Sequence, residues 1–520
     1  MATIVNESLQ RIAKGSFIII GSTVFGLFFA FIGRLLIARY YTQEEYGLFA
    51  QALVILNIAA VFAVLGLREG APRQIAYFQE KDKQPGTQGI IASSLQFPLI
   101  ISSVFTIGLY FASDSIADHF FHDPAVATAI RILAISLPFF VVIQMLSAIF
   151  RGYSQVKPKA YFEDIVRNVL FLALLILIIV IGASFSYTLY AFTASMIVTC
   201  FGFMIYGALR LPYNVAGLRY WLKFQAGWRE LLLFSLPLMA TMMLNMVMTW
   251  TDTIMLGYYK TSAIVGLYNA AFPIALFLLS TPLVSMAFIY SPIATELISK
   301  NLMLDMKRTY TIVTKWVFSL TIPVFAVIFL FPEVVIRIFF GVDYIEAATA
   351  LRILSLGLFI HTVLGPNSAT MIALGKPKVV MWTALIATIA NIILNIALIP
   401  SMGIDGAAIA SASSLALVNI MNSVILYSLC RAHPFTRKYI KPIVVCAILV
   451  VITYMLISQF FEHISLWLLP AIFVLLVFIY GISLILTRSF DDEDITLLTS
   501  LGDRLGTDMQ PIVRIFRKFT

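Results

Sequence analysis

An arginine and an aspartate stand inside long apolar stretches of this chain, and both are candidates for binding chemistry. Arg34 follows an uncharged run over residues 15–33, and Asp252 follows a similar run over residues 231–251. An ionised side chain at the centre of a membrane helix costs roughly 2.5–3.5 kcal/mol on insertion scales, so it normally faces a bundle interior or a wet cavity. We therefore predict that both side chains face a polar cavity.

The two residues differ in the chemistry that they offer there. A planar guanidinium binds two phosphate oxygens at once, which makes Arg34 a candidate contact for an anionic substrate. Its long side chain could instead reach the lipid headgroups. Asp252 is too short to reach them and needs water, a cation or a partner, so we expect it to act as a gate or a coupling residue. A direct ion pair between Arg34 and Asp252, closing an external gate, is a sharper hypothesis.

An internal repeat relates Arg34 to Asp252. Four pairs of matching segments occur in the same order along the two halves, with offsets of 218 to 221 residues. The segments are 38–52 with 256–271, 131–140 with 352–361, 152–159 with 373–378, and Pro72 with Pro292. Each copy holds six predicted helices, an even number, so both copies insert with the same orientation. Parallel repeats of this kind are typical of transporters.

Two further arginines lie at the end of the second predicted helix, in "LGLREGAPRQIA" (65–76). Arg68 and Arg73 either follow the positive-inside rule or capture a phosphate at the cytoplasmic entrance. Glu163 and Arg167 are one helical turn apart at the start of the fifth predicted helix. They could pair locally, so the sequence assigns them no transport role.

The composition indicates a membrane protein. Hydrophobic residues make up 61% and charged residues 12%, against roughly 45–50% and 25% in soluble domains. Apolar runs long enough to span a bilayer occur at 15–38, 45–67, 89–112, 127–150, 161–182, 186–209, 230–258, 263–290, 310–330, 346–373, 379–400, 404–429, 439–458 and 464–487. The predicted fold is an all-α polytopic membrane protein with about 14 transmembrane helices, two parallel six-helix lobes plus two C-terminal helices.

The repeat and the apolar runs together divide the chain into five parts. We predict an N-lobe over 1–210, a cytoplasmic linker over 211–229, a C-lobe over 230–430, two helices within 431–487 and a cytoplasmic tail over 488–520.

The basic residues predict the orientation in the membrane. Most of the 35 lysines and arginines fall in the two tails and the even-numbered loops, whereas only Arg39, Lys260 and Arg337 fall in the odd-numbered loops. This asymmetry predicts that both termini are cytoplasmic. It also accounts for the net charge of +9, so nucleic acid is not needed as a partner.

Motifs for catalysis are missing from the sequence. It holds no glycine-rich nucleotide loop, no His-Glu-x-x-His and no Gly-x-Ser-x-Gly. We therefore expect a transporter without a cofactor or resident metal, and not an enzyme. His361, alone on an apolar stretch, is more typical of a hydrogen-bonded core histidine than of a proton carrier.

Several of these segments resemble the polysaccharide transporter, or oligosaccharide flippase, family of the multidrug/oligosaccharidyl-lipid/polysaccharide (MOP) exporter superfamily. The segments that carry the resemblance are "GRLLIARYYTQEEYGLFAQA", "LGLREGAPRQIA", "TDTIMLGYYKTSAIVGLYNAA" and the Lys-Pro turns at 157–158 and 376–377. The resemblance covers essentially the whole chain.

The resemblance implies that the protein moves an undecaprenyl- or dolichyl-linked oligosaccharide from the inner to the outer leaflet by alternating access. Helices 1, 2, 7 and 8 would line the cavity. Arg34, and less directly Arg39, would contact the pyrophosphate, as an arginine does at a similar place in related lipid II flippases. The implied partners are the lipid-linked substrate, membrane lipids and glycan-assembly proteins in the cytoplasmic membrane of a prokaryote. Coupling to Na⁺ or H⁺ stays open.

Two other functions are compatible with part of the pattern. A drug or metabolite antiporter of the same superfamily usually has twelve helices, so the additional pair argues against it. A membrane-embedded glycan polymerase needs a large external loop with catalytic residues, and the predicted external loops are short.

Overall fold

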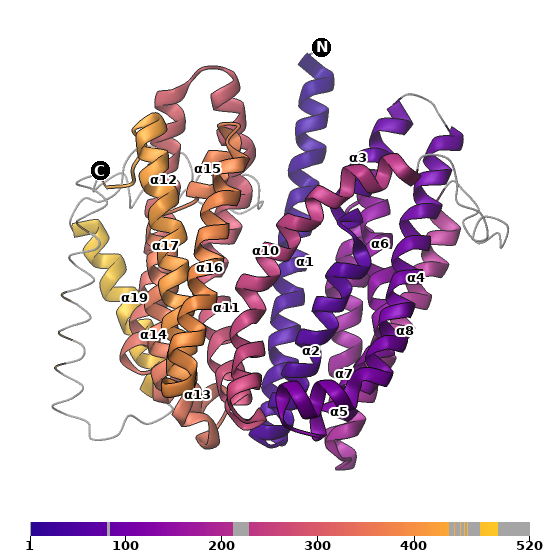
Figure 1. The fold of residues 1–520 in the computed structure, drawn as a ribbon. Coiled ribbons are helices and arrows are strands. Elements are labelled where there is room, and N and C mark those ends of the chain that lie inside the picture. The colour runs from indigo at the N-terminus through magenta and orange to yellow at the C-terminus, as the bar shows by residue number, and fades with distance from the viewer. Residues whose placement is uncertain are drawn as a thin grey trace. The chain divides into compact units, whose positions relative to one another are not determined.

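The computed structural model describes residues 2–80, 84–211, 228–435 and 468–486, together with residues 441, 448, 452 and 455. Within these residues every regular element is a helix (Figure 1). The predicted all-α membrane fold is therefore confirmed. Contacts divide the chain into two units, one over 1–269 with 399–404 and one over 270–398 with 405–520.

The first unit contains most of the helices that carry predicted site residues. In chain order they are α1 (Ala2–Tyr40), α2 (Gln43–Val64), α3 (Leu67–Glu80), α4 (Gln84–Ile116), η1 (Ala117–Phe121), α5 (Ala125–Ala134), α6 (Leu137–Gly152), η2 (Lys159–Val166), α7 (Arg167–Ile181), α8 (Phe185–Arg210) and α10 (Trp228–Tyr259). The first turns of α11 (Ser262–Ser299), residues 262–269, also belong to it.

Local sequence fixes both turns that flank α2. Thr42 caps its start in a capping box, in which Glu45 N donates to Thr42 Oγ1 at 3.2 Å and Thr42 N donates to Glu45 Oε2 at 2.9 Å. Reciprocal bonds of this kind satisfy free amides of the first turn. At the other end Leu65 adopts a left-handed conformation with φ of 51°, which stops α2 before α3 begins.

The core of the first unit lies between α2, α3, α4, α6 and α8. It is built from side chains with almost no exposed surface, among them Ala63, Leu67, Ile75, Leu137 and Phe150. Small residues alternate with large ones, so the helices approach closely. This core holds α3 against α6 and thereby positions Arg68.

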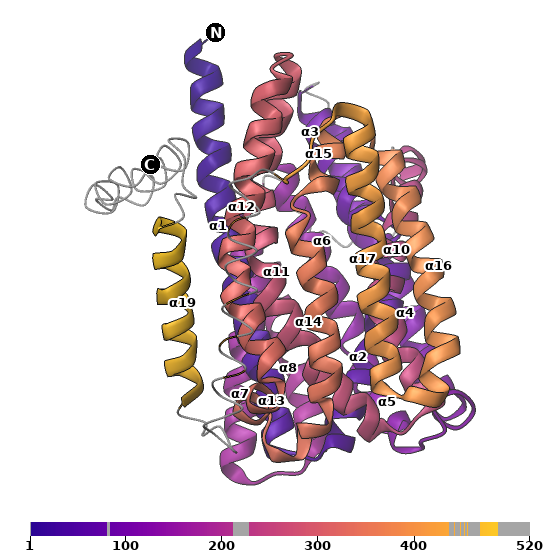
Figure 2. The same ribbon diagram turned by 90° about the vertical axis from the view of Figure 1, so that its left-hand side faces the viewer.

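The second unit is also a bundle of long helices (Figure 2). It comprises the rest of α11, then α12 (Met303–Leu330), α13 (Pro332–Phe339), η3 (Val342–Ala347), α14 (Ala348–Val363), α15 (Asn367–Ala373), α16 (Pro377–Met402), α17 (Ile404–Cys430) and α19 (Leu468–Leu486). Residues 399–404, at the junction of α16 and α17, belong to the first unit. Tyr290, Tyr310 and Met371 are buried in its core. The α19 helix lies beside α12, where Tyr480 Oη donates to Ser319 Oγ at 3.4 Å.

Ten of the described helices are long and apolar enough to cross a membrane, or twelve if each of two bent pairs is one span. Each of the first twelve predicted spans corresponds to one of these helices or pairs. The predicted span at 439–458 lies almost wholly outside the described residues, and the one at 464–487 contains α19. The total of 14 spans therefore stays a prediction.

The predicted domain boundaries also stay a prediction. The linker over 211–229 and the tail over 488–520 lie mostly or wholly outside the described residues. Contacts assign α10 to the first unit, whereas the repeat assigns it to the second copy. The two divisions differ because the units reflect packing, whereas the copies reflect sequence correspondence.

Candidate functional site

The two ends of the first unit differ in chemistry. One end, here named the tyrosine end, carries the turns from α1 to α2 and from α10 to α11, with Tyr40, Tyr41, Tyr258 and Tyr259. The other, here named the arginine end, carries α3, the end of α6 and the start of η2, with Arg68, Arg73, Arg151 and Lys159. In Figure 1 these ends lie at opposite limits of the first unit, marked by α5 and α3.

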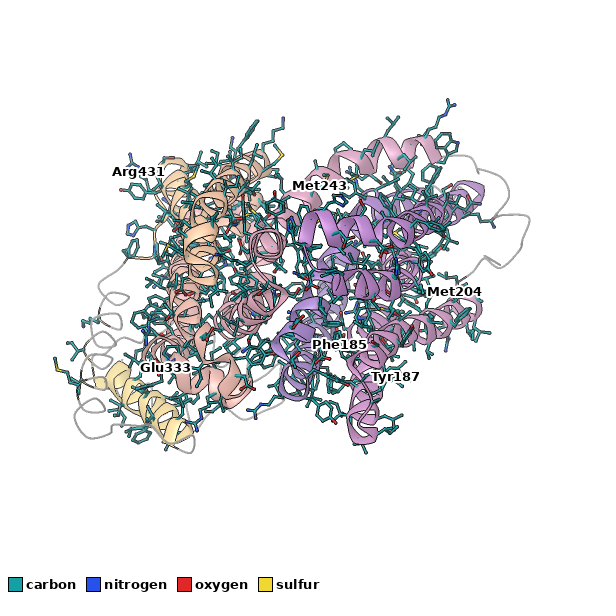
Figure 3. All side chains as sticks on the ribbon, turned by 60° about the horizontal axis from the view of Figure 1, so that its bottom comes forward. Phe185, Tyr187, Met204, Met243, Glu333 and Arg431 are labelled. Carbon is teal, nitrogen blue, oxygen red and sulfur yellow. The ribbon has the colours of Figure 1, made fainter. Side chains whose placement is uncertain are left out.

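Aromatic side chains anchor the α1–α2 turn at the tyrosine end. Tyr41 Oη donates to the carbonyl of Ala183 at 3.2 Å, and its ring meets Phe185 edge to face with centroids 5.6 Å apart. Phe185 and Tyr187 begin α8 at this end (Figure 3). Partial burial raises the pKa of the Tyr41 hydroxyl above its usual value of 10.0, so the group is neutral at physiological pH.

Two glycines that the repeat matches with each other pack backbone against backbone at this end. A Cβ added to Gly47 would lie 1.7 Å from Ser262 O and 3.1 Å from Gly266 N. A Cβ added to Gly266 would lie 2.2 Å from Gln43 O and 3.2 Å from Gly47 N. The contact is nearly reciprocal, so the first turns of α2 and α11 meet at corresponding places of the two copies. Only glycine allows so close an approach.

Side-chain hydrogen bonds surround this glycine contact. Tyr46 Oη donates to the carbonyl of Asn269 at 2.9 Å, and Ser262 Oγ lies 3.1 Å from Gln51 Oε1. Ser262 Oγ is also hydrogen-bonded to Asp123, and Asn269 Nδ2 donates to Thr253 Oγ1 at 3.2 Å. A layer of buried hydrogen bonds therefore ties α2 to α10 and to the start of α11.

Asp252 lies in the middle of this region with 1% of its surface exposed. Its carboxylate accepts a hydrogen bond of 2.5 Å from Tyr268 Oη. The repeat carries a sequence signal for this donor. Tyr268 corresponds to Phe49 in the first copy, so its hydroxyl appears in the copy that also gains the carboxylate.

Arg34 has a different environment. It is half-buried on α1, close enough to Tyr46 to act electrostatically on that hydroxyl. Among the residues that the structure describes, it makes no hydrogen bond or ion pair. The hypothesised ion pair between Arg34 and Asp252 is not formed among the described residues, and the Asp252 carboxylate accepts a hydrogen bond from Tyr268. The guanidinium stays open to a ligand.

Arg39 and Arg73 occupy opposite ends of the first unit. Arg39 is exposed in the last turn of α1, at the tyrosine end. Arg73 is exposed on α3, and its guanidinium carbon lies 4.6 Å from the centre of the Phe234 ring of α10. The structure therefore does not gather the predicted arginines into one site.

Arg68 forms the best-defined ion pair at the arginine end. Its Nη2 lies 2.6 Å from Glu163 Oε1, and its Nη1 donates to Gln144 Oε1 at 3.3 Å. Arg151 donates to the carbonyl of Arg68 and pairs with Glu69 at 3.1 Å. The sequence predicted only a local contact between Glu163 and Arg167, and this was incomplete. Glu163 sits in the π-helix η2, whose wider turn differs from the α-helix assumed in the i, i+4 rule.

A second ion pair lies beside the first. Lys159 Nζ contacts both oxygens of Asp164, at 3.2 and 3.1 Å, and Ser22 Oγ donates to Asp164 Oδ2 at 2.8 Å. Asn168 Nδ2 donates to the carbonyl of Gly26 at 3.2 Å. These bonds fasten η2 and α7 to α1.

The half-buried His361 of the second unit is hydrogen-bonded, as the sequence predicted. Asn419 Nδ2 lies 2.5 Å from His361 Nδ1, and Asn367 Nδ2 donates to Ser423 Oγ at 3.0 Å. Thr383 Oγ1 continues this polar network by donating to Asn422 Oδ1 at 2.7 Å. No group of three or more potential metal ligands occurs among the residues that the structure describes.

Comparisons with known proteins agree with this architecture. The sequence model described as "Polysaccharide biosynthesis protein" matches residues 12–290, and the MatE model matches residues 237–397. The chain is 24% identical over 425 residues to the probable low-salt glycan biosynthesis flippase Agl15 of Haloferax volcanii, covering 80% of this chain and 84% of that protein. It is 24% identical over 357 residues to a putative O-antigen transporter of Shigella flexneri, covering 67% and 81%.

Solved structures show the same fold. The lipid II flippase MurJ in an inward closed conformation superposes with a TM-score of 0.69 at 18% identity, covering 90% of this chain and 98% of that one. An inward-facing multidrug MATE transporter superposes with a TM-score of 0.65 at 18% identity, covering 79% and 95%. With its family match over more than half its length, the chain belongs to the polysaccharide biosynthesis protein family.

Proposed function

We propose that this protein is a flippase that moves a polyprenyl-(pyro)phosphate-linked oligosaccharide from the cytoplasmic to the external leaflet by alternating access. The observation that carries the proposal is Arg34, a half-buried guanidinium in an apolar helix that forms no hydrogen bond or ion pair with a described residue. A charge that is partly withdrawn from water and has no partner is costly. A phosphate that binds there would supply the missing counter-charge.

The physical task also favours a carrier of this kind. A pyrophosphate with several sugars cannot cross hydrocarbon unaided, because its desolvation costs far too much. A wet groove with a cationic contact offsets that cost while the polyprenyl tail stays in lipid. Two relatives are named as a glycan biosynthesis flippase and an O-antigen transporter, and these names support the same substrate class.

We place the arginine end at the cytoplasmic side and the tyrosine end at the external side of a prokaryotic cytoplasmic membrane. The basis is the distribution of lysine and arginine, which concentrate in cytoplasmic loops. In that orientation the Gly47–Gly266 contact closes α2 against α11 on the external side. Asp252 would serve as a gate or coupling residue. A coupling ion, either Na⁺ or H⁺, and glycan-assembly partners belong to the same proposal.

Depletion followed by leaflet-specific detection of lipid-linked oligosaccharide tests the function. If the protein is a flippase, the lipid-linked glycan stays on the cytoplasmic leaflet after the protein has been depleted. If depletion leaves the distribution of the lipid-linked oligosaccharide between the two leaflets unchanged but alters the length of the glycan, the protein is instead a polymerase.

The MatE match over residues 237–397 favours one alternative, a cation-coupled small-molecule antiporter. In that case depletion changes the accumulation of a drug or metabolite and leaves the sidedness of the lipid-linked glycan unchanged.

A further inference from the structure

Five charged side chains gather at the arginine end, where α1, α3, η2 and α7 meet. They are the cations Arg68, Lys159 and Arg167 and the anions Glu163 and Asp164. Three cations against two anions leave the cluster with one positive charge. A ligand that carries two or more negative charges would therefore more than neutralise it.

The Arg68–Glu163 pair is asymmetric in its access to water. Glu163 has 6% of its surface exposed, whereas 32% of the Arg68 side chain is exposed. An anion from solvent can therefore reach Arg68 on its open side, while Glu163 stays inside the bundle. Two of the Arg68 nitrogens already contact Glu163 and Gln144, so the incoming anion competes with, or adds to, those contacts.

Binding of an anion at Arg68 changes the electrostatic situation of Glu163. A second negative group next to a buried carboxylate disfavours its ionised form. A buried charge whose counter-ion is drawn away is also strongly destabilised. Taking up a proton relieves both effects, because the neutral carboxyl no longer needs the full charge of Arg68.

We propose that Glu163 is a proton-binding site whose occupancy is coupled to binding of a phosphate group at Arg68. One proton from solvent binds to a Glu163 carboxylate oxygen when the anion arrives. The same proton leaves when the anion departs and the ion pair forms again. The inference rests on the proposed function, because it takes the anion to be the phosphate group of a polyprenyl lipid.

Charged groups lie on every element that neighbours this site. Glu163 interacts electrostatically with Arg68 of α3, with Lys159 of η2 and with Arg167 of α7. Asp164 is held by Lys159 and by Ser22 of α1, and Arg151 of α6 pairs with Glu69. Asp164 keeps two donors of its own. The π-helix is the element that turns Glu163 toward Arg68, and such turns are frequent at functional sites.

Proton linkage measured by calorimetry tests the proposal. The full chain in detergent is titrated with farnesyl diphosphate at pH 7 to 8 in buffers of different ionisation enthalpy. We expect about one more proton taken up per bound diphosphate in the wild type than in Glu163→Gln. The affinity of the wild type should fall up to tenfold per unit rise in pH, whereas that of Glu163→Gln changes less.

The matched control is Glu69→Gln, which removes a carboxylate from an exposed ion pair on the same helix as Arg68. It should take up protons as the wild type does. An independent readout on the wild type is a protonated-carboxyl C=O band that appears in the infrared difference spectrum when diphosphate binds. This readout decides the question even if Glu163→Gln fails to fold.

Two results would overturn the inference, and they are distinguishable. In the first, diphosphate binds with equal proton uptake in the wild type and Glu163→Gln, and no carboxyl band appears. Glu163 is then not the proton-binding site, but the proposed flippase function is not contradicted. No binding of farnesyl diphosphate to the wild type removes both, because the phosphate contact itself is then absent.

Discussion

The hairpins α1–α2 and α10–α11 are copies of one repeat, yet they carry opposite chemistry at matched places. In the first copy Arg34 makes no hydrogen bond or ion pair with a described residue, and Phe49 packs on the rings of Phe171 and Phe192. In the second copy Asp252 accepts a hydrogen bond from Tyr268. The charged group of the first copy is thus available to an anionic ligand, whereas that of the second copy is hydrogen-bonded within the protein.

This difference distinguishes a ligand-binding role for Arg34 from a structural or gating role for Asp252, which the sequence alone could not do. A binding contact must have capacity left for its ligand. A structural or gating residue, by contrast, is held by protein groups until the protein changes conformation. The pairing in the second hairpin joins α10 to α11, next to the glycine contact that fastens both to α2.

Removing the open charge should have the largest effect. We expect Arg34→Ala to abolish transport of the lipid-linked oligosaccharide at normal membrane abundance, because the cavity loses its phosphate contact. Arg34→Lys should rescue it only in part, since an ammonium cannot bind two oxygens in the same fork. Sidedness of the lipid-linked glycan in complemented cells, with immunoblots of membrane fractions, measures this. Full activity of Arg34→Ala would remove Arg34 from the site.

Breaking the contact between the two copies should have the next largest effect. Gly47→Ala places a Cβ into Ser262 O, so α2 and α11 must separate, at a cost of about 1–3 kcal/mol typical of overpacking. We expect a membrane-impermeant maleimide to label a cysteine introduced at Ser262 more in the Gly47→Ala background than in the background that keeps Gly47. Gly108→Ala, with nothing within 4 Å of its added Cβ, is the matched control. Equal labelling in both variants would contradict the close approach.

Removing the donor to Asp252 should have a smaller effect. Tyr268→Phe makes the second copy resemble the first at this place and leaves the buried carboxylate without that hydrogen bond. We expect a loss of about 1.5–3 kcal/mol of stability, the usual range for a hydrogen bond to a charged group. Thermal unfolding in detergent measures it, with Tyr258→Phe on the exposed surface as control. Combining it with Asp252→Asn should recover most of the loss, and no recovery would mean that the two groups act separately.

Arg39 should matter least. It is exposed in the last turn of α1, where solvent and headgroups screen its charge. We expect Arg39→Gln to lower transport by less than about threefold in the same complementation assay, in line with the small worth of exposed charges. A loss as large as that of Arg34→Ala would show that the phosphate site extends to the tyrosine end.

The apolar runs predicted the fold well, because a span needs only length and hydrophobicity, both of which are local. The first twelve predicted spans appear as helices or bent pairs. The repeat predicted that Arg34 and Asp252 correspond, and the glycine contact joins matched places of the same two copies. For the site, the sequence predicted candidate residues but not the contacts between them. Sequence reasoning named Arg68 but missed Glu163 as its partner, 95 residues away.

The sequence by itself therefore determined the class of protein, its spans and the positions of the rare charges within them. Only the tertiary structure decided which charge is paired and which is open. The physical reason is that membrane helices are apolar nearly all round, so their pattern does not record which face meets another helix. Packing places Glu163 against Arg68 and Tyr268 against Asp252, and it leaves the guanidinium of Arg34 available for a ligand.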